Sequence, residues 1–126
     1  MSRLLFTHSY FLPFDSKQWK QQQPYAPLGT ISAAAVLREA GHDVALHDVM
    51  FSESADEIEA ALKEYKPDYL VIYDDGFNYL TKMCLTVMRE AAFRMTEIAK
   101  SYDCKVIVSS SDSTDHYEKY LQHRAD

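Results

Sequence analysis

Residues 24–48 constrain the fold of this chain more than any other stretch, because they read as a helix that passes directly into a strand. Pro27 stands where the first helical turn needs no N–H donor, and Gly41 stands where the end of a helix favours left-handed backbone. Apolar residues recur at helical spacing between the two, and residues 43–48 then alternate as a half-buried strand does. This order is typical of proteins in which helices and strands alternate.

The same alternation continues along the rest of the chain. We expect strands at residues 4–6, 43–48, 69–73 and 105–108. We expect helices at residues 27–41, 54–66, 80–102 and 114–121, and a long loop over residues 8–26. The buried stripe predicted for the third helix consists of Leu80, Met83, Val87, Met88, Ala91, Met95 and Ile98.

A single α/β domain over residues 1–126 accounts for this pattern. A length of 126 residues with 47% hydrophobic residues suits one core. Repeated strand and helix units predict a parallel sheet covered by helices on both faces and joined by right-handed crossovers. We therefore expect a flavodoxin-like or Rossmann-like three-layer sandwich with strand order 2-1-3-4, extended to 2-1-3-4-5 where a fifth strand is present.

Charge and cysteine content exclude several kinds of partner. The net charge is −6 and the 13 Lys and Arg residues are scattered, whereas a nucleic-acid surface needs them clustered. No apolar run approaches the roughly 20 residues that span a bilayer. Cys84 falls in a predicted helix and Cys104 at a strand start, which favours a reduced protein. We expect a cytoplasmic protein that binds neither nucleic acid nor membrane.

Three loops of the expected fold meet at its ligand-binding edge. Ligands of such sheets bind at the carboxyl ends of the strands, near the point where the strand order reverses. The loops that start there cover residues 7–29, 74–79 and 109–114. The chain has no Gly-x-Gly-x-x-Gly string, no phosphate-binding Gly-Lys-Ser or Gly-Lys-Thr, and no nucleophile elbow. We expect a site for a small-molecule cofactor, without catalytic residues or metal ligands from the protein.

The string Pro-Tyr-Ala-Pro-Leu-Gly at residues 24–29 resembles the start of the cobalamin-binding domain that precedes the catalytic barrel in many radical S-adenosylmethionine enzymes. The turns Tyr-Asp-Asp-Gly-Phe-Asn at residues 73–78 and Ser-Ser-Ser-Asp at residues 109–112 resemble the turns that hold the corrin and its nucleotide tail. The resemblance implies that the chain binds cobalamin. The residues it places at the cofactor are Thr7, His8, Pro27, Leu28, Gly29, Asp74, Asp75, Gly76, Phe77, Asn78, Ser109, Ser110, Ser111 and Asp112.

Two departures from the family pattern refine this expectation. The Asp-x-His-x-x-Gly string, whose histidine ligates cobalt in domains of the methionine synthase type, is absent. The resemblance then implies cobalamin with its base off cobalt and no protein histidine in its place, so that His8 lies in the pocket but not on the metal. Ser109, Ser110 and Ser111 stand where the family usually has a glycine pair, which opposes a very close approach of backbone to the nucleotide.

The last residues resemble the family stretch that precedes a fifth strand. Residues 120–126 read Tyr-Leu-Gln-His-Arg-Ala-Asp, where the family usually has Gly-Ala-Asp before an apolar run. We therefore expect the fifth strand to be missing, and the chain to be a naturally short relative or the N-terminal piece of a larger enzyme. In the larger enzyme, the downstream radical domain would hold S-adenosylmethionine and a [4Fe-4S] cluster. An exposed edge at residues 105–108 predicts marginal stability or a dimer through that edge.

Two other functions are compatible with the same fold. A receiver-type regulatory domain would use Asp74 or Asp75 as its switch residue, but it would also need an acidic pair after the first strand, where Thr7 and His8 stand. A protein-interaction domain would have kept the fold and lost the ligand. Cobalamin binding separates the first function from the other two, and labelling by acetyl phosphate identifies the receiver.

Overall fold

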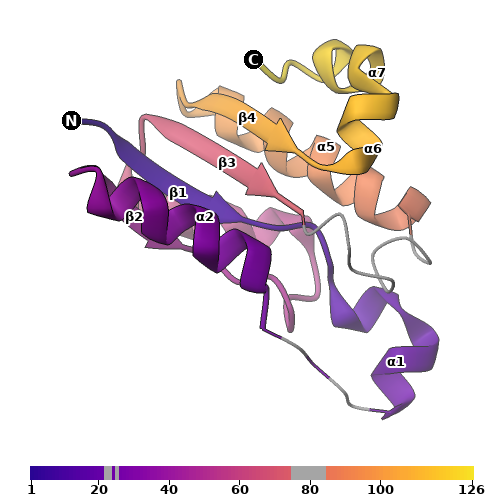
Figure 1. Ribbon diagram of the computed structural model, residues 1–126. Coiled ribbons are helices and arrows are strands. Elements are labelled where there is room, and N and C mark those ends of the chain that lie inside the picture. The colour runs from indigo at the N-terminus through magenta and orange to yellow at the C-terminus, as the bar shows by residue number, and fades with distance from the viewer. Residues whose placement is uncertain (22–23, 25, 75–84) are drawn as a thin grey trace.

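The computed structural model describes residues 1–21, 24, 26–74 and 85–126. In this part of the chain, four strands form one parallel sheet in the order β2-β1-β3-β4 (Figure 1). The strands are β1 (Arg3–Thr7), β2 (Asp43–Leu46), β3 (Tyr69–Tyr73) and β4 (Lys105–Ser109). The fold class and strand order predicted from the sequence are confirmed.

Helices cover both faces of the sheet and give the molecule three layers (Figure 1). The described helices are η1 (Leu12–Phe14), α1 (Ser16–Gln21), α2 (Leu28–Glu39), η2 (Ala55–Glu57), α3 (Ile58–Tyr65), α5 (Leu85–Ser101), α6 (Ser111–Asp115) and α7 (Tyr117–Gln122). Helix α2 lies on one face, α3 and α5 lie on the other, and α1 lies beyond the carboxyl ends of the strands. The architecture is flavodoxin-like and Rossmann-like.

Alternate residues of β1 and β3 pack into two separate cores, as the period of two in a strand requires. Leu4 and Phe6 of β1 pack with Ala34 of α2. Leu5, between them, joins the larger core on the opposite face with Met95 of α5. A strand that is apolar on both faces, such as β1, is therefore buried on both sides.

Three helix ends carry residues that favour the start or the end of a helix. Ser54 and Glu57 form a capping box that opens η2, and α3 continues directly from it. Gly41 follows α2 with a φ of 98°, in the region that favours glycine. Lys66 ends α3 in left-handed backbone, with a φ of 52°, just before Pro67.

The segment predicted as a long loop, residues 8–26, contains η1 and α1 and is anchored in the larger core. Tyr10, Phe11 and Leu12 are almost completely buried. The Leu12 N–H donates to the Met50 carbonyl at 2.9 Å, and the Phe11 N–H contacts the Met88 sulfur at 3.4 Å. The later part of this segment is polar, and for that reason the whole segment was predicted as a loop although its first residues are apolar and buried.

Two predicted details of the helices are wrong. The last helix is two short helices, because the Ser110 capping box starts α6 early and the chain breaks at His116 before α7. On α5, Met88, Met95 and their partners are buried as predicted, but Val87 is 42% exposed. One step along a helix turns a side chain by about 100°, which places Val87 at the margin of the buried face that is centred near Met88. Leu80 and Met83 lie outside the described residues.

The edge of β4 is not fully open, contrary to the sequence expectation. Asp126 donates its N–H to the Val106 carbonyl at 2.8 Å, and its carboxylate accepts the Val106 N–H at 2.8 Å. The chain reaches this position after Arg124, which adopts left-handed backbone with a φ of 76°. The first outward-facing pair of backbone groups on β4 is therefore covered by residues that follow α7.

Candidate functional site

The carboxyl ends of β1, β3 and β4 lie side by side, and hydrogen bonds connect the segments that leave them. The Asp74 N–H donates to the Ser109 carbonyl at 2.9 Å, which joins the ends of β3 and β4. The Thr30 hydroxyl donates to the Tyr73 carbonyl at 2.6 Å, which fixes the start of α2 over the end of β3. The Thr7 hydroxyl donates to the His47 carbonyl at 2.8 Å, beside β2. Thr7, Asp74 and Ser109, three of the predicted residues, therefore lie along one edge of the sheet.

His8 is buried at this edge and both of its ring nitrogens are occupied. Nδ1 accepts the Tyr10 N–H at 3.3 Å, so the proton of the neutral ring belongs on Nε2, which donates to Asp48 at 2.7 Å. This hydrogen bond is the main cause that holds the pKa of Asp48 below its ordinary value. The imidazole is thus a fixed structural group in the described part of the chain.

Ser9 and Asp74 form a second pair, between the first and third strands. The Ser9 N–H and hydroxyl donate to the two carboxylate oxygens of Asp74 at 2.7 and 2.8 Å. Burial raises the pKa of Asp74 above its ordinary value, against the lowering effect of these hydrogen bonds. Asp74 was predictable at this edge from the sequence, whereas Ser9 and Asp48 were not, because their partners lie far away along the chain.

The serine-rich turn after β4 divides into capping and exposed residues. Ser110 accepts the Ser113 N–H at 2.9 Å, and Ser113 accepts the Ser110 N–H at 3.1 Å, so this pair caps α6. The side chains of Ser109 and Ser111 are exposed. They are the hydroxyls of this turn that can meet a ligand.

Asp112, which the resemblance places at the cofactor, is held inside the protein. Its carboxylate accepts two hydrogen bonds from Arg89, at 2.7 and 2.6 Å, and one from the Tyr120 hydroxyl at 2.7 Å. Burial opposes ionisation of Asp112, but these hydrogen bonds outweigh it and keep its pKa below the ordinary value. Asp112 therefore positions the turn that precedes it.

The start of α2 gives this edge an apolar border. Pro27 is buried, whereas Leu28 and Ile31 are 68% and 40% exposed. Gly29 belongs to the first turn of α2 and is half-buried. The other predicted contacts, Asp75, Gly76, Phe77 and Asn78, lie outside the described residues.

Protein-held metal and thiol chemistry find no support in the part of the chain that the structure describes. No group of three or more His, Cys, Asp or Glu side chains is placed there to hold a metal ion. Cys104 is buried, and burial raises the pKa of its thiol to about 11. A thiol that remains protonated at neutral pH is a poor nucleophile.

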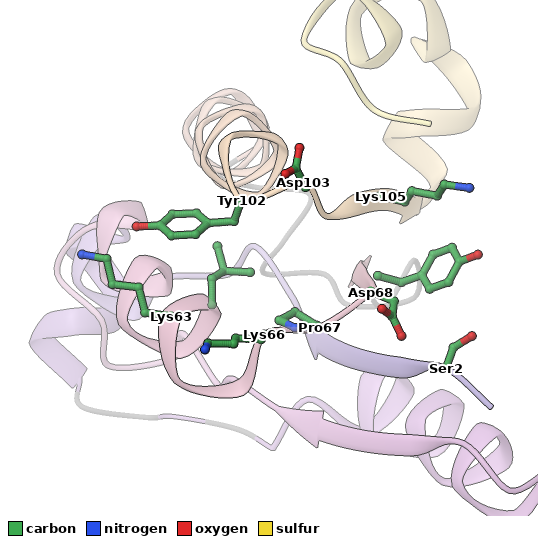
Figure 2. Close-up of a pocket in the computed structure, with 10 residues that line it drawn as sticks. Ser2, Lys63, Lys66, Pro67, Asp68, Tyr102, Asp103 and Lys105 are labelled. Carbon is green, nitrogen blue, oxygen red and sulfur yellow. The ribbon is translucent and has the colours of Figure 1, made fainter.

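A separate hollow of about 750 Å³ lies at the opposite, amino end of the sheet (Figure 2). Figure 2 shows Lys63, Lys66 and Lys105 around it, with Tyr102 at one side. Helices α3 and α5 end beside this hollow, and cations near helix C-termini are favourable without any ligand. Ligands of parallel sheets bind at the other end of the strands, so the carboxyl edge remains the candidate site.

Comparison with known proteins adds support for the fold. No protein-family model matches the chain, and no curated protein matches it. Among solved structures, TesA matches over 98% of this chain and 75% of its own, with a TM-score of 0.50 and 16% sequence identity. At that identity the likeness concerns the fold alone. None of the helices in the described ranges is both long and apolar enough to cross a membrane.

Proposed function

We propose that this chain is the cobalamin-binding domain of a radical S-adenosylmethionine enzyme, either a methyltransferase or an oxidoreductase. The observation that carries the proposal is that segments 7–8, 27–29 and 109–111, which the resemblance assigns to the cofactor, come together at the carboxyl edge of the sheet. This is the edge at which parallel sheets of this order bind their ligands.

The side chains exposed at this edge match the chemistry of a corrinoid. A corrin ring has amide groups at its periphery and largely apolar faces. Ser109 and Ser111 offer exposed hydroxyls for the amides, and Leu28 and Ile31 offer apolar surface that a ligand would remove from water. Thr30 keeps the two kinds of surface together by joining α2 to the end of β3.

The hydrogen bonds of His8 favour a bound cobalamin whose cobalt has no histidine ligand. To ligate a metal, His8 would have to give up its bond with Asp48 or with the Tyr10 N–H. Releasing the buried Tyr10 N–H would leave it unsatisfied at a cost of about 1–3 kcal/mol, and releasing Asp48 would break the hydrogen bond that holds the pKa of Asp48 low. His8 instead shapes the floor of the site and orients Asp48.

In the proposed enzyme, the cofactor, this chain and a downstream domain have separate tasks. Bound cobalamin supplies a carrier for a methyl group or for electrons, and a downstream domain with S-adenosylmethionine and a [4Fe-4S] cluster would supply the radical step. This chain would bind the corrinoid, orient it through the serine turn and the start of α2, and present it to that domain. The buried, unpaired thiol of Cys104 suits a reducing, cytoplasmic setting.

The receiver alternative has less support. Both carboxylate oxygens of Asp74 accept hydrogen bonds from Ser9, and the residues after β1 are His8 and Ser9 instead of an acidic pair. A phosphoryl group would have to displace the Ser9 hydroxyl from a buried carboxylate.

Titration with hydroxocobalamin, followed by its visible absorbance, tests the proposal. We expect a saturable one-to-one change in the native chain, strongly weakened in Gly29→Val and retained in Ala40→Val, at the other end of α2. Valine is a slightly better helix residue than glycine, so loss of binding in Gly29→Val would not come from loss of the helix. Absence of any saturable change, or phosphorylation of Asp74 by acetyl phosphate, would overturn the proposal.

A further inference from the structure

Helix α5 carries two distinct stripes of contacts. One stripe is apolar and includes Met88, Met95 and Ala99, which pack in the larger core. The other stripe consists of Arg89, Phe93, Glu97 and Lys100. At about 100° per residue these four positions fall within one face of the helix, turned away from the apolar stripe. Each of these four side chains contacts a residue that follows β4.

Residues 111–126, here called the C-terminal strap, meet this second stripe mainly through charged groups. Arg89 forms a bidentate pair with Asp112, with the shorter contact at 2.6 Å. Lys100 forms an ion pair with Asp126, also at 2.6 Å. These two pairs lie near the two ends of the strap and of the stripe.

The middle of the strap is held by His123, which combines a polar and an aromatic contact. Its Nδ1 lies 2.7 Å from the Glu97 carboxylate, and its ring stacks on Phe93 with centroids 4.0 Å apart. Tyr120 meets the same Phe93 ring edge-on at 4.8 Å. The strap therefore contacts α5 at three places along the helix, near Arg89, near Phe93 and Glu97, and near Lys100.

The apolar burial in this docking is concentrated on Tyr120, which belongs to the larger core. Tyr120 is the only large apolar side chain of α6 and α7 that is buried. Tyr117 and Leu121 are 58% and 53% exposed. Between the strap and β4 lies a hollow of about 240 Å³, bordered by Val108, Tyr117 and Leu121. A helix that belongs to a core normally buries an apolar stripe, and α7 does not.

The strap covers the outer edge of the sheet. Asp126 bonds both the N–H and the carbonyl of Val106. Because backbone groups of a strand alternate in direction, Val108 faces the same edge, next to the hollow. The sequence Val-Ile-Val at 106–108 has no charge to discourage pairing with another strand.

We propose that the C-terminal strap is an electrostatic latch that opens as a unit and thereby exposes the edge of β4. Release of the strap withdraws Tyr120 from the larger core and uncovers the backbone groups of Val106 and Val108, while the rest of both cores stays packed. The inference does not depend on the ligand of the carboxyl edge.

Amide hydrogen exchange of the full chain tests the latch. The variant Glu97→Gln with Lys100→Met removes the Lys100–Asp126 ion pair and the charge that Glu97 presents to His123. Its matched control, Glu90→Gln with Lys66→Met, makes the same charge changes at exposed positions outside the stripe. In the first variant we expect exchange at Val106 to rise by roughly tenfold or more, with exchange at Leu70 and Ile72 unchanged. The control should leave all three amides as in the native chain.

Two results would overturn the proposal. Unchanged exchange at Val106 in the latch variant would mean that these ion pairs do not hold the strap. An equal rise at Val106 and Ile72 would mean that the strap opens only with global unfolding. As a second measurement on the native chain, raising the salt concentration from about 0.1 to 1 M shortens the Debye length from about 10 to 3 Å. Higher salt should accelerate exchange at Val106 and leave Leu70 and Ile72 unchanged. Unchanged exchange at Val106, or an equal rise at Val106 and Ile72, would overturn the latch.

Discussion

Ser9 gives both of its hydrogen-bond donors to Asp74, with the N–H 2.7 Å from one carboxylate oxygen and the hydroxyl 2.8 Å from the other. Ser9 follows β1 and Asp74 follows β3, so this pair connects the ends of two neighbouring strands at the point where the strand order reverses. The pair also places a buried carboxyl group at the edge proposed to bind the cofactor. Its charge state consequently affects both stability and the site.

The substitution Asp74→Asn should keep the fold and flatten its pH dependence. Burial raises the pKa of Asp74, so the folded state holds a proton more tightly than the unfolded state does. Stability from this group is then present below the unfolded pKa of about 3.9 and is lost as pH rises through the folded value. Asparagine can still accept the Ser9 N–H and bond its hydroxyl. Urea unfolding from pH 4 to pH 8 should show equal or greater stability for the variant at pH 8.

Ser9→Ala is the matched variant for this pair. It keeps the N–H bond to Asp74, removes the hydroxyl bond, and should lower the free energy of unfolding by about 1–3 kcal/mol. A variant as stable as the native chain at every pH would show that the Ser9 hydroxyl does not support Asp74.

Removing Arg89 should be far more damaging than removing its charge together with that of Asp112. Arg89→Met leaves a buried carboxylate without its ion partner, which costs about 3–5 kcal/mol. In the double variant with Asp112→Asn no buried charge remains, and the amide can still accept from the Tyr120 hydroxyl. We expect most of the lost stability to return. A double-mutant cycle by urea unfolding at pH 7 measures both effects.

The pH dependence gives an independent check on this ion pair. Hydrogen bonds outweigh burial and hold the pKa of Asp112 low, so its contribution is present above the unfolded pKa of about 3.9 and is lost as pH falls through the lower folded value. The difference in stability between the native chain and Arg89→Met should therefore shrink from pH 7 towards pH 3. A difference that stays constant would assign the loss to packing and not to charge.

The four strands and helix α2 were predictable because local signals specify them. Pro27, Gly41 and the alternation in residues 43–48 act within a few residues of their own position. The pairs of the candidate site were not predictable in this way. His8 finds Asp48 forty residues away, and Ser9 finds Asp74 sixty-five residues away. Periodicity says which face a residue occupies, but it does not say which polar group meets it there.

The break of the last helix illustrates the same limit. Of the large apolar residues Tyr117, Tyr120 and Leu121 in this segment, Tyr120 is buried and the other two are exposed. Ion and ring contacts with α5 hold the segment in addition to the burial of Tyr120, and its apolar pattern alone does not reveal them. The serine turn was placed correctly at the end of β4, but the inward orientation of Asp112 depends on Arg89 in another element.

Cobalamin bound to this chain should have no protein nitrogen on cobalt. His8 already uses Nδ1 and Nε2 within the protein. Electron paramagnetic resonance of the cob(II)alamin complex should thus lack nitrogen hyperfine splitting from either the protein or the displaced base. Splitting that is present in the native chain and disappears in His8→Ala would contradict this expectation.

Arg124→Gly should stabilise the chain. Arg124 is exposed and adopts a φ of 76°, in the left-handed region, where an L side chain costs roughly 1–2 kcal/mol relative to glycine. Glycine gains entropy in the unfolded chain, which offsets part of the benefit, so we expect a net gain of about 0.5–1 kcal/mol. Arg124→Ala is the control, because it removes the same charge and keeps the strain. Equal stability of the two variants would show that the backbone here relaxes without cost.

Self-association through β4 should depend on how well Asp126 covers Val106. Asp126→Ala removes the carboxylate that accepts the Val106 N–H and pairs with Lys100, so it should both free the edge and loosen the strap. Two copies joined at this edge would pair their β4 strands about a two-fold axis, as closed symmetric dimers do. Ile107 is 44% exposed, and adding Ile107→Lys places a charge in the middle of each pairing strand.

Sedimentation at rising protein concentration should therefore show a dimer for Asp126→Ala and a monomer for the double variant. Both proteins should have the same circular dichroism, because residue 107 faces away from the larger core. If Asp126→Ala remains monomeric at high concentration while its Val106 amide exchanges fast, the edge is open but does not pair, and the sequence expectation of a dimer is wrong. If that amide stays protected, a group other than Asp126 covers the strand.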